Sequence, residues 1–359
     1  MTNFTLIRFS HLAAVLLVCL GQPIKAQTTT GEPGLFDIDS ILQITLTGDL
    51  HSLFNDRSDN STDHPLVISY RAENGNDVAL SIQAKTRGHF RKTMGNCKYP
   101  PILLQFSNRD TPESSIFHEQ HKLKLVVPCS GDEYVVREWM VYKIYNLVSS
   151  ESFRARLVRI TLNDTKKKKL SPPFYGFVLE EERQLAARNH DIVIKKQMNP
   201  KEVAPDAFLK MAVFQYLIGN TDWSVQYQNI KLIATDSNAL PVAVPYDFDH
   251  AGLVNPPYAQ PAEELNMRSV RERRYRGYCI NGMKAFEDVF ALYNRLKPAI
   301  YKLYDDCPLF DSKYKKETLA YFDEFYKTIN DPVAAKKEFT YPCDPNGTGN
   351  VIIKGLKED

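Results

Sequence analysis

Residues 219–250 constrain the fold more than any other part of this chain. They begin Gly-Asn-Thr-Asp-Trp-Ser and end Pro-Tyr-Asp-Phe-Asp-His, with two short apolar runs between them, at 228–233 and 240–244. Short apolar runs separated by turn-forming residues predict the two strands of a hairpin. Pairing of these strands would bring the two flanking loops together. The polar residues that meet there would be Asp222, Asn229, Asp247 and Asp249.

Three carboxylates in a small space repel one another and raise each other's pKa unless a cation lies among them. Oxygen donors without nearby Cys or His favour Mg²⁺ or Mn²⁺, ions that proteins commonly hold through one or two carboxylates and the phosphates of a nucleotide. Phosphoryl transferases use such residues in separate roles: Asp222 would orient or deprotonate the attacking hydroxyl, and Asn229 and Asp247 would hold the metal, with Asp249 as a second ligand or a supporting carboxylate. Taken singly, a loop aspartate is more often a turn former or cap, and that alternative stays open.

The ordered set resembles the core of the CotH-type atypical kinases, a family named for a spore-coat protein kinase. The similarity rests on Gly-Asn-Thr-Asp-Trp-Ser, the following Asn229 and Pro-Tyr-Asp-Phe-Asp, and it extends over residues 86–252. It implies ATP as co-substrate and an α+β, bilobal, minimal kinase-like fold. That fold would place a β-rich N-terminal lobe at 35–182 and a helical C-terminal lobe at 183–338. From Asp222 to Asn229 the spacing is two residues longer than in the ordinary protein-kinase loop, so the base and metal roles are carried by the resemblance.

A second element of the resemblance is Arg87-Gly88, which is similar to the Arg-Gly-Asn-Ser element of the family with His89 and Phe90 in place of Asn-Ser. Glycine among basic residues lets backbone N–H groups and arginine approach phosphates. An Arg-Gly pair is equally common in plain turns. Phosphate binding by Arg87 and a simple turn are therefore equally supported.

Residues 121–127 alternate charged and apolar side chains, which predicts a half-buried strand with Lys122 and Lys124 on one face. One of them would be the phosphate-pairing lysine of a kinase, and two solvated lysines are the equally supported alternative. The apolar stripe of residues 132–149 predicts a helix. It contains Glu138, which by its position would pair with the strand lysine.

The run Tyr-Gly-Phe-Val-Leu-Glu-Glu at residues 175–181 is similar to the Tyr-x-Gly-x-Tyr-x-Leu-x-Glu run of the CotH-type family. The resemblance places the nucleotide base against residues 178–181, including Glu181. Residues 180–183 are expected to form an acidic turn.

Residues 205–218 predict a helix that is apolar on nearly every side, and therefore a buried mount for the loop that follows. Five arginines between residues 268 and 276 could hold an acidic substrate, although a surface helix edge is slightly favoured. The remaining predicted elements are strands at 66–70, 78–82, 156–162 and 174–179, and helices at 285–304 and 313–329.

Residues 1–26 have a charged start and a short apolar run, well below the roughly 20 residues that a membrane span needs. They predict a signal peptide cleaved after Ala26, followed by a linker at 27–34, and therefore a secreted or periplasmic protein without a membrane span. Without Cys19 five cysteines remain, an odd number that leaves at least one unpaired. Cys97 with Cys129 is the favoured bridge. The tail, residues 339–359, is expected to be loosely ordered.

The net charge of +2 argues against nucleic acid as the main partner. The favoured function is ATP- and Mg²⁺-dependent (or Mn²⁺-dependent) phosphoryl transfer to a hydroxyl of an exported protein or glycan acceptor. One alternative is a non-catalytic exported binding or surface-assembly protein on the same scaffold. Another is a metal-dependent hydrolase that uses the same carboxylates, because one fold hosts many activities.

Overall fold

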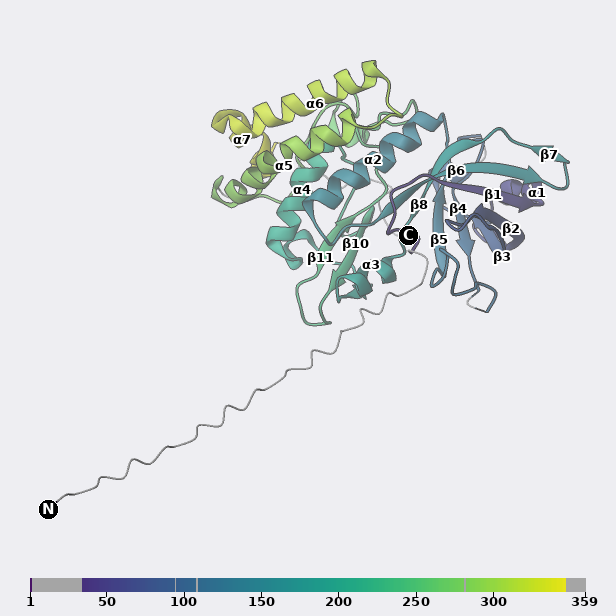
Figure 1. The fold of residues 1–359 in the computed structure, drawn as a ribbon. Helices are drawn as coiled ribbons and strands as arrows, with labels where there is room; N and C mark the ends of the chain where they lie inside the picture. The colour runs from purple at the N-terminus through teal and green to yellow at the C-terminus, as the bar shows by residue number, and fades with distance from the viewer. Residues whose placement is uncertain (2–33, 94, 108, 281, 347–359) are drawn as a thin grey trace. The chain divides into compact units, whose positions relative to one another are not determined.

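A closed β-sheet occupies the first half of the described chain, and a mostly helical region follows it (Figure 1). The computed structural model describes residues 1, 34–93, 95–107, 109–280 and 282–346. The predicted signal peptide and linker lie almost entirely outside these residues, as does the end of the predicted tail. Within the described ranges, no helix is long and apolar enough to cross a membrane.

The sheet closes because its first strand returns to pair with a strand far along the sequence. Its order is β1-β2-β3-β4-β5-β8-β6-β7, and β1 also pairs in parallel with β6, with Ile44 opposite Ile160. Closure leaves neither β1 nor β6 as a free edge, which removes a site for unwanted strand pairing. The strands are β1 (Leu42–Gly48), β2 (His64–Arg71), β3 (Asp77–Thr86), β4 (Ile102–Gln105), β5 (Lys122–Val126), β6 (Ala155–Asp164), β7 (Lys169–Leu170) and β8 (Phe174–Leu179).

Side-chain alternation fills the interior of this sheet. Along β2 the buried positions alternate with partly exposed ones, and β2 and β3 form the hairpin that the sequence predicted, with Ile68 opposite Leu80. The turn between them contains Gly75 at φ 84°. The short helix α1 (Leu50–Asn55) covers one end through the fully buried Leu53.

Strands β6 and β8 are buried on both faces and so belong to two hydrophobic cores. Val158 and Val178 face the interior of the sheet, whereas Leu157 and Phe177 face helix α2 (Asp132–Val148) and the helical region. Strands buried on both faces read as continuous apolar runs rather than as alternating ones. The sequence of β8 has this character, whereas β6 carries Arg156 and Arg159 among its apolar residues.

The second half of the chain is helical apart from one small sheet, so the fold is mixed α+β as predicted. A three-stranded antiparallel sheet has the order β11-β10-β9. The predicted boundary at residues 182 and 183 stays a prediction. The helices are α3 (Glu182–Arg188), α4 (Pro205–Ile218), α5 (Glu287–Asp305), α6 (Ser312–Asn330) and α7 (Pro332–Phe339), and the strands are β9 (Ile192–Ile194), β10 (Ile230–Ala234) and β11 (Val242–Pro245).

Two features differ from the expectations. Residues from Glu182 form helix α3 rather than an acidic turn. The first part of the predicted loose tail is ordered, because Phe339 is fully buried and Cys343 forms a disulfide with Cys279.

The favoured bridge, Cys97–Cys129, is present in the structure. Cys307 is the described cysteine that lies outside both disulfides.

Candidate active site

Helix α4 holds the loop that carries Asp222. Its C-terminus is set by Gly219, whose φ of 68° is left-handed and whose added Cβ would lie 2.1 Å from the Tyr321 hydroxyl. Glycine is therefore required on both grounds. The buried Asn220 then binds back to the helix: its N–H donates to the Gln215 carbonyl at 2.8 Å, and its side-chain amide donates to Gln215 Oε1 at 3.0 Å.

Two side-chain amides orient the Asp222 carboxylate. Gln228 Nε2 donates to Asp222 Oδ1 at 2.6 Å, and Asn229 Nδ2 donates to Asp222 Oδ2 at 3.2 Å and to its carbonyl oxygen at 2.7 Å. Burial is the largest influence on the carboxyl and raises its pKa, which His250 opposes and Asp247 reinforces. A carboxylate with a raised pKa is a stronger proton acceptor.

The hairpin of β10 and β11 brings Asn229 and Asp247 together, as the sequence predicted. Ile230 pairs with Pro245, and the Tyr246 N–H donates to the Asn229 carbonyl at 3.0 Å. Asn229 and Asp247 have left-handed φ values of 57° and 63°. Strained backbone of this kind in non-glycine residues is concentrated at functional sites.

Asp247 and Asp249 lie against buried polar groups. The Asp247 N–H donates to the Tyr142 hydroxyl oxygen at 2.9 Å, and the Tyr258 hydroxyl donates to Asp249 Oδ2 at 3.1 Å. Burial and the Asp249 carboxylate raise the pKa of Asp247, while Arg87 and other nearby cations lower it. The acidic pair is therefore held close under mutual repulsion.

Glu138 of α2 is buried beside this pair, but its cation is not the predicted one. Burial raises the pKa of Glu138 well above its ordinary value, and Asp249 and Asp247 raise it further. The cation that lowers it is Arg91, from the segment after β3. Across the described residues, no ion pair joins Glu138 to Lys122 or Lys124: Lys122 is exposed, and the ammonium of Lys124 lies over the Tyr246 ring.

The two strand lysines differ in their surroundings. Lys122 is exposed, whereas Lys124 is partly buried with its ammonium 4.5 Å from the centre of the Tyr246 ring. Burial, together with Arg87 and Lys231, lowers the pKa of Lys124 to about 7. Lys124 therefore changes charge near neutral pH, and it is the lysine of the pair that lies near Asp247.

The predicted base-binding run follows β8. Val178 and Leu179 are buried in the two cores, and Glu180 is held by Arg188, with both carboxylate oxygens accepting at 3.0 Å. Glu181 is partly exposed at the N-terminus of α3, and its side chain makes no capping hydrogen bond there. Of this run, Glu181 is the acidic side chain that is accessible to a ligand.

Arg87 lies at the end of β3, where its N–H donates to the Pro101 carbonyl at 3.0 Å. Gly88 is exposed at φ 84°, and an added Cβ would meet no atom closer than Pro101 Cγ at 4.0 Å. The backbone geometry at Gly88 therefore agrees with the alternative of a simple turn. The guanidinium of Arg87 nevertheless acts on Asp247 and Lys124, which places its charge near the candidate site.

Four residues near the site were not predicted from the sequence as site residues. His250 and Arg276 act on Asp222, and Arg91 and Tyr258 act on the acidic pair. Arg276 could have been predicted from its place in the arginine run. For His250, Arg91 and Tyr258, the only indication in the sequence was their nearness to Arg87 or Asp249.

The arginine run itself is not a helix edge. Arg271, Arg273 and Arg276 donate to backbone carbonyls of Gly252, Leu217 and Trp223 at 3.1, 3.2 and 3.3 Å. These carbonyls belong to the segments that carry the acidic pair and Asp222. Three of the arginines therefore stabilise the loops of the site.

The oxygen atoms of Asn229, Asp247 and Asp249 fit a Mg²⁺ or Mn²⁺ ion that is also coordinated by phosphates. Because the Asn229 amide nitrogen donates to Asp222, its Oδ1 remains as an acceptor at the end of the hairpin where Asp247 also lies. A cation would relieve the repulsion that raises the pKa of Asp247. No group of three or more His, Cys, Asp or Glu residues in the described ranges is arranged as a metal site by itself. Two carboxylates and one amide oxygen suit an ion whose coordination shell is completed by phosphates and water.

No protein-family model matches this chain, and no curated protein matches it in sequence. Among solved structures, it is similar to a chain titled "Crystal structure of A Helicobacter pylori proinflammatory kinase CtkA". That similarity has a TM-score of 0.41 and 15% sequence identity, and it covers 71% of this chain and 94% of that chain.

Proposed function

We propose that this protein is an exported phosphotransferase that uses ATP with Mg²⁺ or Mn²⁺ and transfers a phosphoryl group to a hydroxyl of a protein or glycan acceptor. The observation that carries the proposal is the meeting of Asp222, Asn229 and Asp247 at the open end of one hairpin. The order of these residues resembles that of the CotH-type kinases. The predicted signal peptide and the two disulfides support export.

Each of the central residues has one role in this proposal. Asp222, held by Gln228 and Asn229, accepts the proton of the acceptor hydroxyl. Asn229 Oδ1 and the carboxylates of Asp247 and Asp249 hold the metal, which neutralises charge on the transferred phosphoryl group. Positioning and charge stabilisation, rather than covalent chemistry, are what such a reaction asks of the protein.

The outer residues bind the nucleotide. Arg87 and Lys124 supply positive charge on the phosphate side, because both act on Asp247. Glu181 lies where the base would rest. Lys122 is exposed and is the weaker candidate for a phosphate contact.

The test is thermal unfolding of the mature protein with and without ATP and Mg²⁺ or Mn²⁺. A ligand at about 100 times its dissociation constant adds about 2.7 kcal/mol to stability, which moves the midpoint by several degrees. The shift should require both metal and nucleotide and should disappear in Asp247→Ala. Asp222→Asn should keep the shift and lose phosphoryl transfer. Absence of a shift with any nucleotide would refute the proposal.

One observation favours a second candidate, a non-catalytic exported binding or surface-assembly protein on the same scaffold. Glu138 is not paired with a strand lysine, and the pKa of Lys124 is lowered to about 7, so the usual phosphate-binding pair is missing from the described residues. This candidate predicts that Asp222→Asn leaves the biological function intact and that ATP does not bind.

A further inference from the structure

The segment between β3 and β4 carries a buried arginine to the acidic residues. It contains one turn of 3₁₀-helix, η1 (Phe90–Lys92), and the Arg91 side chain within it is only 9% exposed. Arg91 Nη2 donates to the Val127 carbonyl, whereas its Nε has no hydrogen-bond partner in the part of the chain that the structure describes. Buried donors are normally paired, so the unpaired Nε of this buried guanidinium is an exception that its surroundings must explain.

The surroundings of Arg91 are acidic. Burial by itself lowers the pKa of its guanidinium, and four neighbouring groups, three of them carboxyl groups, outweigh that effect, so the pKa lies above its ordinary value. The four groups are Tyr258, Asp249, Glu138 and Asp247. An isolated cluster of buried carboxylates is unstable without a cation, and Arg91 is one of the cations that this fold provides, with Arg87 and Lys124.

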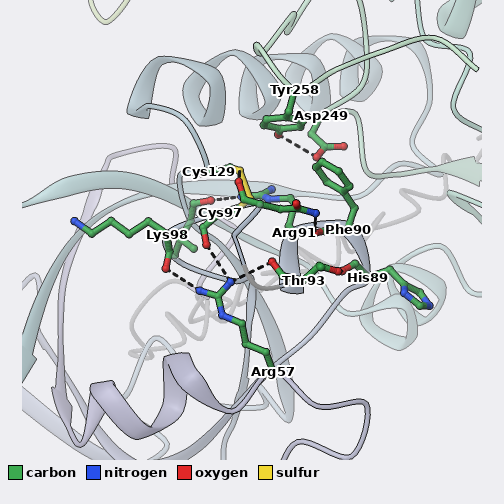
Figure 2. Close-up of a disulfide and its surroundings, with 12 residues drawn as sticks. Arg57, His89, Phe90, Arg91, Thr93, Cys97, Lys98, Cys129, Asp249 and Tyr258 are labelled. Atoms are coloured by element: carbon green, nitrogen blue, oxygen red, sulfur yellow. Dashed lines mark hydrogen bonds between the residues drawn. A yellow bond between two sulfur atoms is a disulfide. The ribbon is translucent and has the colours of Figure 1, made fainter.

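The neighbours of Arg91 reach the same residues. Phe90 lies with its ring centre 5.7 Å from that of Tyr258 and 6.1 Å from that of His250. Tyr258 in turn donates to Asp249. Figure 2 shows Phe90 and Arg91 with Asp249 and Tyr258. The segment therefore interacts with the loop that carries Asp249 through the charge of Arg91 and through the aromatic contact of Phe90 with Tyr258.

The Cys97–Cys129 disulfide links this segment to the part of the chain that contains Val127, the hydrogen-bond acceptor of Arg91. Cys97 follows Arg91 in the same segment, and Cys129 lies two residues after Val127, whose carbonyl Arg91 binds. Arg57 adds a second tie, because its guanidinium donates to the carbonyls of Cys97 at 3.0 Å and Lys98 at 2.9 Å (Figure 2). A covalent tie and a backbone clamp together limit how far Arg91 can move.

We propose that Arg91 is a positioning residue of the active site: it is the countercharge of Glu138 and, together with Arg87, of the Asp247–Asp249 pair, and the Cys97–Cys129 disulfide fixes the segment that presents it. This inference rests on the proposed function for its consequence in catalysis. It gives a loop arginine the place beside Glu138 that a strand lysine was expected to fill. Arg91 orders the carboxylates before metal and nucleotide arrive.

The first test compares Arg91→Gln, which removes the charge, with Arg91→Lys, which keeps it. Arg156→Gln is the matched control, because Arg156 is a buried arginine that binds the carbonyls of Leu35 and Ser40. In ligand-free protein, hydrogen–deuterium exchange over residues 246–258 should rise in Arg91→Gln, return toward the native rate in Arg91→Lys and stay native in Arg156→Gln. Unchanged exchange in Arg91→Gln overturns the inference, whatever the protein does with ATP.

The second readout is calorimetric affinity for Mn²⁺ alone and for ATP with Mg²⁺. Loss of a group that orients metal ligands typically weakens metal binding by about 10- to 100-fold, and Arg91→Gln should do so while Arg91→Lys restores part of the affinity. Tighter Mn²⁺ binding in Arg91→Gln would mean that Arg91 only repels the metal, which overturns the inference. If the native protein binds neither Mn²⁺ nor nucleotide, the proposed function fails, and the exchange measurement still decides the role of Arg91.

The third readout separates the two disulfides. Cys97→Ser with Cys129→Ser should raise exchange over residues 246–258, as Arg91→Gln does. Cys279→Ser with Cys343→Ser should leave that segment native. If Arg91→Gln does not fold, the first disulfide variant carries the test, and native exchange in it overturns the inference.

Discussion

Lys124 is the residue at the site whose charge should change near neutral pH. Burial and two nearby cations lower its pKa from 10.5 to about 7. Nucleotide phosphates attract the charged form, so ATP affinity should fall as pH rises through this range, by at most about tenfold per pH unit for one proton. Lys124→Met should bind ATP more weakly at pH 6.5 and lose most of this dependence. Calorimetric titrations between about pH 6 and 9 would measure it.

The same pKa has a consequence for stability whose sign is fixed. Because the folded pKa lies below the unfolded one, the unfolded chain binds more protons between about pH 7 and 10.5, so this lysine makes stability rise with pH in that window. Lys122→Met is the control, since Lys122 is exposed on the same strand. Equal pH dependence of ATP affinity in the native protein and in Lys124→Met would contradict the assignment.

At the residue scale, the sequence predicted which polar residues come together where those residues follow a clear strand pattern. Asp222, Asn229 and Asp247 meet because the hairpin between them could be read from its apolar runs. The countercharge of Glu138 could not be predicted this way. Arg91 reaches it through an irregular segment whose course depends on a disulfide and on a distant arginine, Arg57.

At the scale of elements, the segment that contains Arg276 stabilises the loop that carries Asp222. Arg276 is partly buried, and its guanidinium donates to the carbonyls of Thr221 and Trp223, on either side of Asp222. Arg276→Lys keeps the charge but loses the planar fork, and leaving buried partners unpaired costs about 1–3 kcal/mol. We expect faster amide exchange over residues 219–229 and a lower kcat with little change in the KM for ATP.

Arg274→Lys is the matched variant for that experiment, because Arg274 donates to the Tyr341 hydroxyl in the C-terminal segment. It should lower stability without changing exchange in the catalytic loop. If both variants alter residues 219–229 equally, the stabilisation is a general property of the segment and not of Arg276.

Elements with a strong local signal were predicted from the sequence, and long-range pairings were not. Helix α4 was predicted with its observed bounds, because Pro205 begins it and Gly219 ends it. The parallel pairing of β1 with β6 joins residues more than 100 positions apart, such as Ile44 and Ile160, and no local pattern reports it. Helix α3 was missed because its acidic start also suits a turn.

At the scale of the whole molecule, β6 and β8 connect the sheet interior to the helical region. Neighbouring residues on one strand enter different cores: Leu157 faces the helices and Val158 faces the sheet interior, and both are almost completely buried. On the other strand, the ring centre of Phe177 lies 5.5 Å from that of Tyr142, whose hydroxyl oxygen accepts a hydrogen bond from the Asp247 N–H. Loss of packing in the sheet should therefore reach the acidic pair.

Shared strands predict that the closed sheet and the helical region unfold together. Trp139 on α2 and Trp223 beside Asp222 both report on the helical core, whereas far-ultraviolet circular dichroism reports on the whole fold. In guanidinium chloride the two signals should give one midpoint, and Ile160→Ala should lower both by the same amount, equivalent to about 2–5 kcal/mol. Leu170→Ala, at an exposed position of β7, should change neither. A fluorescence transition that stays at the native midpoint in Ile160→Ala would show that the two cores are stable independently, and the link from the sheet to the active site would then be lost.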